Sequence, residues 1–141
     1  MIKKILNPGT YTREINIALL FLRVSIGIFM LTHGTGKLIT LLDGGAIEFV
    51  DPIGIGPTAS LTFAVFAEFV CSLLLIFGAA TRFAVIPLLI TMLVAVLIVH
   101  SADAFQVKEK ALLYFSVFVS LLIAGAGKIS IDNLIYKKIN S

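Results

Sequence analysis

Four long apolar runs dominate the hydrophobic pattern of this chain, at residues 15–32, 59–80, 83–99 and 111–127. Each run approaches the roughly 20 residues that an α-helix needs to cross the hydrocarbon core of a bilayer. The last two runs contain no charged residue, whereas the first contains only Arg23 and the second only Glu68. The pattern predicts an all-α, integral-membrane four-helix bundle that forms one domain over residues 1–141, with helices at about 15–36, 59–80, 83–101 and 109–128.

The connections between these runs differ in length. Only Thr81 and Arg82 separate the second run from the third, which predicts a tight hairpin, and the polar residues 101–110 join the third run to the fourth. The first connection, residues 37–58, is long and rich in turn-forming residues: Gly44, Gly45, Pro52, Gly54, Gly56 and Pro57. We expect a short interfacial turn at 46–50, and we expect the whole segment to cap one mouth of the bundle.

Lysine and arginine residues gather on one side of the predicted bundle. With four crossings, one side carries Lys3, Lys4, Arg13, Arg82, Lys128, Lys137 and Lys138, and the other carries only Lys37, Lys108 and Lys110. Short loops that are rich in Lys and Arg stay in the cytoplasm. The distribution therefore predicts that both termini are cytoplasmic and that the long loop lies outside.

Composition narrows the class of protein. Hydrophobic residues make up 59% of the 141 residues and charged residues 13%, against about 45–50% and about 25% in typical soluble domains. A small domain cannot hide so much apolar surface from water, which excludes a soluble enzyme and a disordered segment. Cys71 is the only cysteine, which excludes an internal disulfide. The net charge is +3, but the basic residues lie at the ends of apolar runs, so we expect a lipid bilayer and no nucleic acid as partner.

Arg23 and Glu68 need a reason to lie inside a bilayer, because a charge near its centre costs at least roughly 2.5 kcal/mol. The first two helices run antiparallel, and we expect these residues to face each other at similar depth. An arginine and a carboxylate can then satisfy each other through two hydrogen bonds. Such a pair either fixes the helix register or forms part of a binding or proton site, and the sequence leaves both interpretations open.

A second group of polar residues marks the outer rim of the predicted bundle. His33 and Lys37 are four residues apart and share one face of the first helix. The others follow the third helix or open the fourth: His100, Asp103, Lys108, Glu109 and Lys110. These residues are either interfacial charges or a polar vestibule for an anionic or quinone-like head group. Two histidines on different helices do not predict a metal site.

Several short motifs, in this order, resemble the DoxX family. Arg23 and the sequence His-Gly-Thr-Gly-Lys-Leu at 33–38 look like its first helix, and Glu68 with the segment 72–82 looks like its second helix and hairpin. Glu109 matches the start of its fourth helix. The sequence Gly-Ala-Gly-Lys-Ile-Ser-Ile-Asp at 125–132 looks like its terminal Gly-Pro-Gly-Arg-Tyr-Ser-Leu-Asp signature, with alanine in place of the usual proline. The resemblance covers nearly the whole chain beyond residue 15.

The resemblance implies a four-helix bacterial or archaeal inner-membrane protein. Relatives in this family include membrane subunits of oxidoreductase complexes, one of them linked to quinone. Most members have no assigned activity, so membership alone does not settle function. The motif residues that the resemblance transfers to this chain are Arg23, His33, Lys37, Glu68, Glu109, Lys128 and Asp132.

We therefore expect a non-catalytic subunit or anchor of an oxidoreductase or stress-response complex, working with a protein partner or as a homo-oligomer. In this hypothesis a quinone-like or small anionic ligand binds in the bundle through Arg23, His33, Lys37, Glu68, His100 and Glu109. The chain has no cysteine pair, haem-ligand pair or flavin motif, so we expect no catalysis by this chain alone. Two alternatives stay open: a small transporter or channel that uses Arg23 and Glu68, and a purely structural assembly factor.

Overall fold

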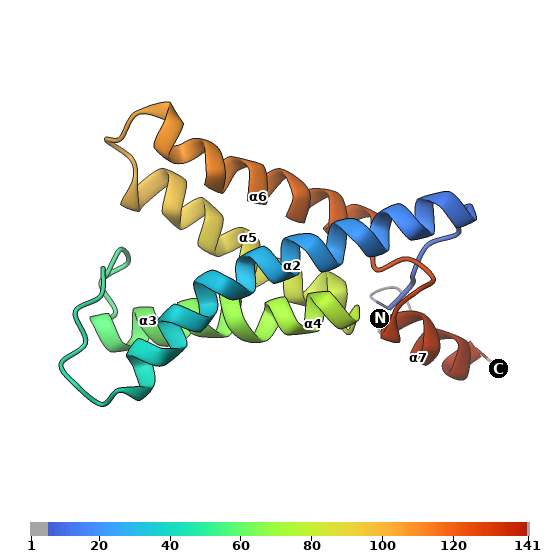
Figure 1. Cartoon of the computed structure of the whole chain (residues 1–141), viewed down its shortest axis with the longest axis horizontal. Helices are drawn as coiled ribbons and strands as arrows, with labels where there is room; N and C mark the ends of the chain where they lie inside the picture. The colour runs from blue at the N-terminus through green and yellow to red at the C-terminus, as the bar shows by residue number, and fades with distance from the viewer. Residues whose placement is uncertain (1–5, 141) are drawn as a thin grey trace.

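The computed structural model describes residues 6–140, and every regular element within them is helical (Figure 1). The elements in chain order are α2 (Arg13–Leu42), α3 (Pro57–Val65), η1 (Phe66–Val70), α4 (Cys71–Phe77), α5 (Thr81–Val94), η2 (Ala95–Val99), α6 (Phe105–Ala124) and α7 (Ile131–Asn140). The elements η1 and η2 are π-helical turns. They continue their neighbours without a break, so α3, η1 and α4 form one rod, and α5 with η2 forms another.

Three helices are long and apolar enough to cross a membrane: Arg13–Leu42, Pro57–Phe77 and Thr81–Val99. They correspond to the first three predicted helices. The first is longer than predicted, because the regular helix continues for more than a turn beyond residue 36. The all-helical, membrane-spanning class is therefore confirmed. The fourth crossing is not, because three charged residues lie near the start of α6: Lys108, Glu109 and Lys110.

Two local expectations are wrong. Residues 46–50 form no interfacial helical turn and have no regular structure. A further helix, α7, lies beyond residue 128, where the last of the four predicted helices ends. Its apolar residues recur at helical spacing and are exposed: Ile131, Leu134, Ile135 and Ile139. This pattern defines an amphipathic surface helix.

Helix α2 packs along the whole α3–η1–α4 rod, and α5 packs against α6. The closest approach is at Gly34, where an added Cβ would lie 2.5 Å from the backbone carbonyl of Glu68. Only glycine lets the two backbones come this near. The buried core between the helices is apolar and includes Met30, Leu75, Val85, Leu88, Phe118 and Leu121.

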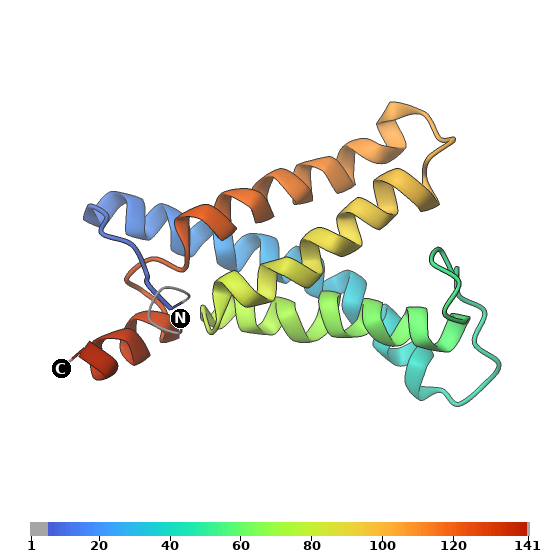
Figure 2. The same ribbon diagram turned by 180° about the vertical axis from the view of Figure 1, so that it is seen from behind.

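The molecule has two distinct ends, which are visible from both sides (Figures 1 and 2). One end holds the start of α2, the α4–α5 turn, the segment after α6, and α7. The other end holds the long α2–α3 loop and the α5–α6 turn. We call the first the junction end, after the junction formed by residues 125–133 with their contacts, and the second the cavity end.

Candidate functional site

Arg23 belongs to the junction. Its Nη1 donates a hydrogen bond to the backbone oxygen of Ala126 at 2.8 Å, and its Nη2 donates to that of Ile129 at 2.9 Å. The residue is 1% exposed. Gly78 makes room for the guanidinium: an added Cβ there would lie 2.2 Å from Nη1, and the backbone has a φ of +66°, which favours glycine. Arg23 therefore ties the chain after α6 to the helical body.

Asp132 caps a helix to which it does not belong. Its Oδ1 accepts a hydrogen bond from the backbone N–H of Ala80 at 2.6 Å, and its Oδ2 accepts one from that of Thr81 at 2.9 Å. These N–H groups open α5, which has no side-chain cap from its own N-cap residue. A carboxylate at this position satisfies orphan donors and complements the helix dipole. Asp132, the last residue of the family signature, thus caps the N-terminus of the third apolar helix.

Two further side chains complete the junction. The Nε of Arg82 donates to the carbonyl of Leu122 at 3.1 Å, which satisfies an orphan carbonyl in the last turn of α6. The Oδ1 of Asn16 accepts a hydrogen bond from the backbone N–H of Lys128 at 2.6 Å. Each of these bonds joins segments far apart in the sequence. We conclude that the junction holds the helices together.

The expected Arg23–Glu68 pair is wrong. Glu68 lies opposite Gly34, which is roughly 16 Å from Arg23 along α2 at 1.5 Å per residue. Arg23 instead reaches backbone carbonyls at the junction end. The two residues are therefore not at similar depth, and a transport path that runs through both loses its main support.

The cavity end contains a cavity of about 620 Å³. It lies between the α3–η1 segment and the α5–η2 rod, and residues of the long loop form part of its wall: Phe49, Val50, Pro52, Ile53 and Ile55. Most of the lining is apolar. Ligand sites in proteins typically have volumes of about 300–1,000 Å³ and apolar walls with a few polar groups. The loop covers this part of the molecule, as expected from the sequence.

Asp51 anchors the loop. Its carboxylate accepts hydrogen bonds from the Ser60 hydroxyl at 2.7 Å and from the backbone N–H groups of Ile55 at 3.0 Å and Gly56 at 2.8 Å. The Ser60 hydroxyl, followed by the loop N–H groups, holds the pKa of Asp51 below its ordinary value. The loop is thus pinned to the first turns of α3.

Lys37 and Glu68 form a charged pair on the cavity wall. The Nζ of Lys37 donates to the Oε1 of Glu68. The Glu68 side chain is 3% exposed and that of Lys37 is 30% exposed. The other carboxylate oxygen, Oε2, has no hydrogen-bond partner among the residues described. A buried carboxylate oxygen without a donor is costly, so this atom marks a place where a ligand donor would be stabilising.

Both π-helical turns contribute to the cavity wall. Glu68 lies within η1, and His100 directly follows η2. Such turns are rare and are frequent at functional sites, because the extra residue changes which side chains face inward. Their presence on two rods at one cavity is a structural argument for a binding role.

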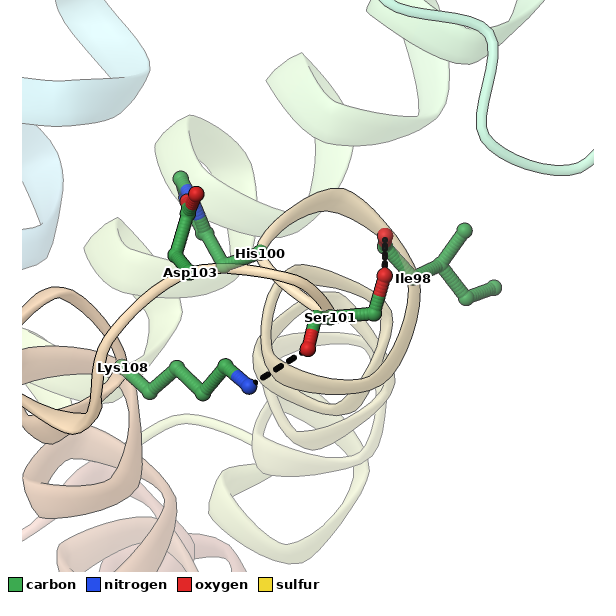
Figure 3. Close-up of polar contacts among 5 residues, drawn as sticks. All are labelled: Ile98, His100, Ser101, Asp103 and Lys108. Atoms are coloured by element: carbon green, nitrogen blue, oxygen red, sulfur yellow. Dashed lines mark hydrogen bonds and ion pairs between the residues drawn. The ribbon is translucent and has the colours of Figure 1, made fainter.

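His100 is held in a polar turn at the rim of the cavity. Its Nδ1 lies 2.7 Å from the Oδ2 of Asp103. Figure 3 shows this turn, in which the Nζ of Lys108 donates to the backbone oxygen of Ser101 at 2.7 Å. The contacts tie the start of α6 to the end of η2.

The structure brings three of the six proposed site residues to one cavity, namely Lys37, Glu68 and His100. The other three lie elsewhere. Arg23 is in the junction, His33 packs edge-on against Tyr114 with ring centroids 6.2 Å apart, and Glu109 is exposed on α6. Among residues 6–140, no cluster of three or more His, Cys, Asp or Glu could hold a metal ion.

Sequence reasoning missed the apolar lining that the loop supplies. Phe49, Ile53 and Ile55 lie within a segment whose glycines and prolines predicted turns only. Their apolar side chains, in a polar connection, were the available signal. The two π-helical turns have no such signal in the sequence, because their residues are as apolar as the helices on either side.

Comparisons with known proteins agree with the motifs. The profile of the DoxX family matches residues 18–101. An uncharacterized protein of Haemophilus influenzae is 33% identical over 130 residues, which cover 85% of this chain and 92% of that protein. A second uncharacterized protein of the same organism is 36% identical over 75 residues, half of each chain. No solved structure matches the chain. With its three apolar helices and these matches, the chain belongs to the DoxX family of membrane proteins.

Proposed function

We propose that this protein is a membrane-embedded binding subunit whose cavity holds a quinone-like ligand. The observation that carries the proposal is the Lys37–Glu68 pair on the wall of the 620 Å³ cavity, in which Glu68 is buried and its Oε2 is unpartnered among the described residues. The remainder of the wall is mostly apolar. This combination suits a lipid-soluble molecule with one polar head.

The charges at the cavity favour a neutral head group over an anion. The positive charge of Lys37 is already offset by Glu68, so an anion would lose its hydration without meeting a net positive charge. The ammonium of Lys37 has further N–H groups that can donate to a carbonyl oxygen. The free oxygen of Glu68 can accept a hydrogen bond from a hydroxyl. A quinone and its reduced form present these two groups, and an apolar tail would lie along the loop wall.

Access to the cavity from the side supports a ligand that dissolves in lipid. Phe63 and Ile90 line the cavity and are also exposed, at 66% and 56%. They belong to α3 and α5, which are parts of the candidate membrane spans Pro57–Phe77 and Thr81–Val99. A ligand in the bilayer would thus reach the cavity between these helices without crossing water.

We place this subunit in the bacterial inner membrane as one domain with four crossings, α6 being the fourth. Lys3 and Lys4 lie outside the described residues. With both termini in the cytoplasm, as the sequence predicts, the cavity faces the outer side. We propose that the chain serves an oxidoreductase or stress-response complex, with a protein partner or a second copy.

The proposal is tested by binding of a short-chain quinone to the purified protein in lipid nanodiscs. Glu68→Gln keeps one oxygen for Lys37 and removes the charged acceptor. A hydrogen bond to a charged group contributes about 1.5–3 kcal/mol, so we expect the affinity to fall about tenfold or more. Glu109→Gln is the matched control, because Glu109 is exposed and does not line the cavity.

Thermal stability as a function of quinone concentration gives the readout. We expect saturable stabilisation of the wild type and of Glu109→Gln, with a weaker response of Glu68→Gln. Absence of saturable stabilisation in the wild type would overturn the proposal. A response to small anions but not to quinones would replace it with the anion alternative.

A further inference from the structure

A second hollow lies at the junction end, on the opposite end of the molecule from the cavity. Its volume is about 500 Å³. Residues of α2, α4 and the segment from 128 to α7 form its walls, including Arg23, Phe77, Lys128, Ser130 and Leu134. We call it the junction groove. It is independent of the quinone-like ligand proposed above.

The polar part of the junction groove is cationic. Lys128 is exposed, and its ammonium has no hydrogen-bond or ionic partner within residues 6–140. Arg23 forms part of the lining, and its Nε has no hydrogen-bond partner among the described residues although the side chain is buried. Within residues 6–140, no Asp or Glu lines the groove. The carboxylate of Asp132, which follows Ile131 of the groove wall, is already engaged by the N–H groups of Ala80 and Thr81.

The remaining wall of the junction groove is apolar and exposed. Phe77 is 60% exposed and Leu134 is 66% exposed. Ile131 joins them from the first turn of α7. On α7 the apolar face continues beyond the groove, and Lys137 and Lys138 follow in the last turn. A helix of this kind lies in the membrane interface, with its apolar face toward the acyl chains and its lysines toward the head groups.

We infer that the junction groove binds one anionic phospholipid. The phosphate lies against Lys128 with the positive charge of Arg23 behind it, and an acyl chain runs along Phe77 and Leu134. A free phosphate would leave the apolar wall uncovered, whereas a phospholipid matches both parts. The groove lies toward the junction end of α2 and at the end of the candidate span Pro57–Phe77, which is the depth at which lipid head groups are found.

Lipid binding here would connect the bilayer to the junction. The Ser130 hydroxyl donates to the carbonyl of Gly127 at 2.6 Å, and the backbone of Ile129 holds Arg23. A lipid seated on the same segment would therefore clamp the chain between α6 and α7 against α2. Retention of an anionic lipid should raise the thermal stability of the protein.

Native mass spectrometry of the full chain, with matched phosphatidylglycerol and phosphatidylethanolamine, tests the inference. We expect the wild type to bind phosphatidylglycerol about fivefold more tightly, as one basic residue near an anionic lipid surface provides. Lys128→Gln should remove most of this preference, because only the buried charge of Arg23 is left in the groove. Lys110→Gln is the control, since it removes an exposed lysine at the cavity end. Leu134→Gln should weaken the binding of both lipids and leave the preference for phosphatidylglycerol unchanged.

Each of three results would overturn the inference: equal binding of both lipids by the wild type, an undiminished preference in Lys128→Gln, or an equal loss in Lys110→Gln. The last would mean that general surface charge attracts the lipid. Both lysines are exposed, and melting curves of the two variants establish that they fold. The quinone titration is unaffected by any of these outcomes, so the two proposals stand or fall separately.

Discussion

Helix α2 carries two cations that point into the molecule at opposite ends, and they are satisfied in different ways. Arg23 donates to two backbone carbonyls from the far end of the chain. Lys37 pairs with a single carboxylate, and that carboxylate keeps an oxygen without a partner among the described residues. A cation that is bonded to the backbone of a distant segment stabilises the fold. A carboxylate oxygen that lacks a donor on a cavity wall retains the capacity to bind.

The same contrast holds for the surroundings of the two cations. The junction consists of many backbone groups, which are matched by Asn16, Arg82 and Asp132. The cavity is bounded by apolar side chains, by two π-helical turns and by a loop held through Asp51. Variants at the junction should therefore change stability, and variants at the cavity should change ligand affinity.

Asp132→Ala should give the largest effect. The substitution leaves two N–H groups at the start of α5 without an acceptor and removes the carboxylate from the neighbourhood of Arg23. Breaking a buried charged arrangement of this kind costs roughly 3–5 kcal/mol. This loss is measured as the change in the free energy of unfolding in mixed detergent micelles.

Asp132→Asn should lose less stability, because one oxygen still accepts a hydrogen bond. Asp43→Ala is the matched control, since Asp43 is an exposed acid after α2. Equal stability of Asp132→Ala and Asp43→Ala would show that the junction does not hold the helices together.

The glycines of α2 offer a sharper comparison of intermediate size. An alanine at position 34 would meet the Glu68 backbone at 2.5 Å, and one at position 36 would meet nothing within 4 Å. Gly34→Ala should therefore cost about 1–3 kcal/mol through overpacking. Gly36→Ala should stabilise by about 0.5–1 kcal/mol, because alanine favours the helix.

The same micelle unfolding assay compares the two variants. Gly34→Ala should also weaken quinone binding, because it displaces the turn that carries Glu68. Similar stability of both alanine variants would argue against the close approach of α2 and η1.

The smallest effect concerns pH and the loop. The hydrogen bonds from Ser60 and the loop lower the pKa of Asp51, so the ionised form is favoured in the folded loop. The resulting stabilisation is fully present above the ordinary aspartate pKa of about 3.9 and is lost as the pH falls toward the lowered value. Hydrogen exchange at Ile55 and Gly56 should accelerate, relative to the intrinsic rate, over that acidic range. Asp51→Asn should show no such transition, and a wild type without one would contradict the anchoring role.

Much of the fold was predictable because bilayer-length apolar runs carry a strong signal. The first three helices and the loop that covers the cavity follow from apolar runs and turn-forming residues. Helix α7 was missed because its apolar residues are few and interspersed with lysines and asparagines. The crossing by α6 stays a prediction, since three consecutive charged residues, Lys108 to Lys110, lie near its start.

The site was less predictable, because partners in space are not partners in sequence. Arg23 binds backbone carbonyl groups, which every residue possesses, so the residue types in the sequence do not indicate this contact. Its supposed partner was chosen from charge and estimated depth. That estimate failed because the glycine contacts set the register, and they place Glu68 beside Gly34 and Arg23 beside Gly78. Lys37 was expected to be a site residue, but its pairing with Glu68 depended on the register between α2 and η1.

The different roles of Arg23 and of the Lys37–Glu68 pair are tested most directly by one titration. Binding of a short-chain quinone is measured on Arg23→Gln and Glu68→Gln, together with their melting temperatures in the absence of ligand. We predict that Arg23→Gln melts at a lower temperature and binds with wild-type affinity where it is folded, while Glu68→Gln melts close to the wild type and binds weakly. Loss of affinity in Arg23→Gln, with wild-type affinity in Glu68→Gln, would contradict the account.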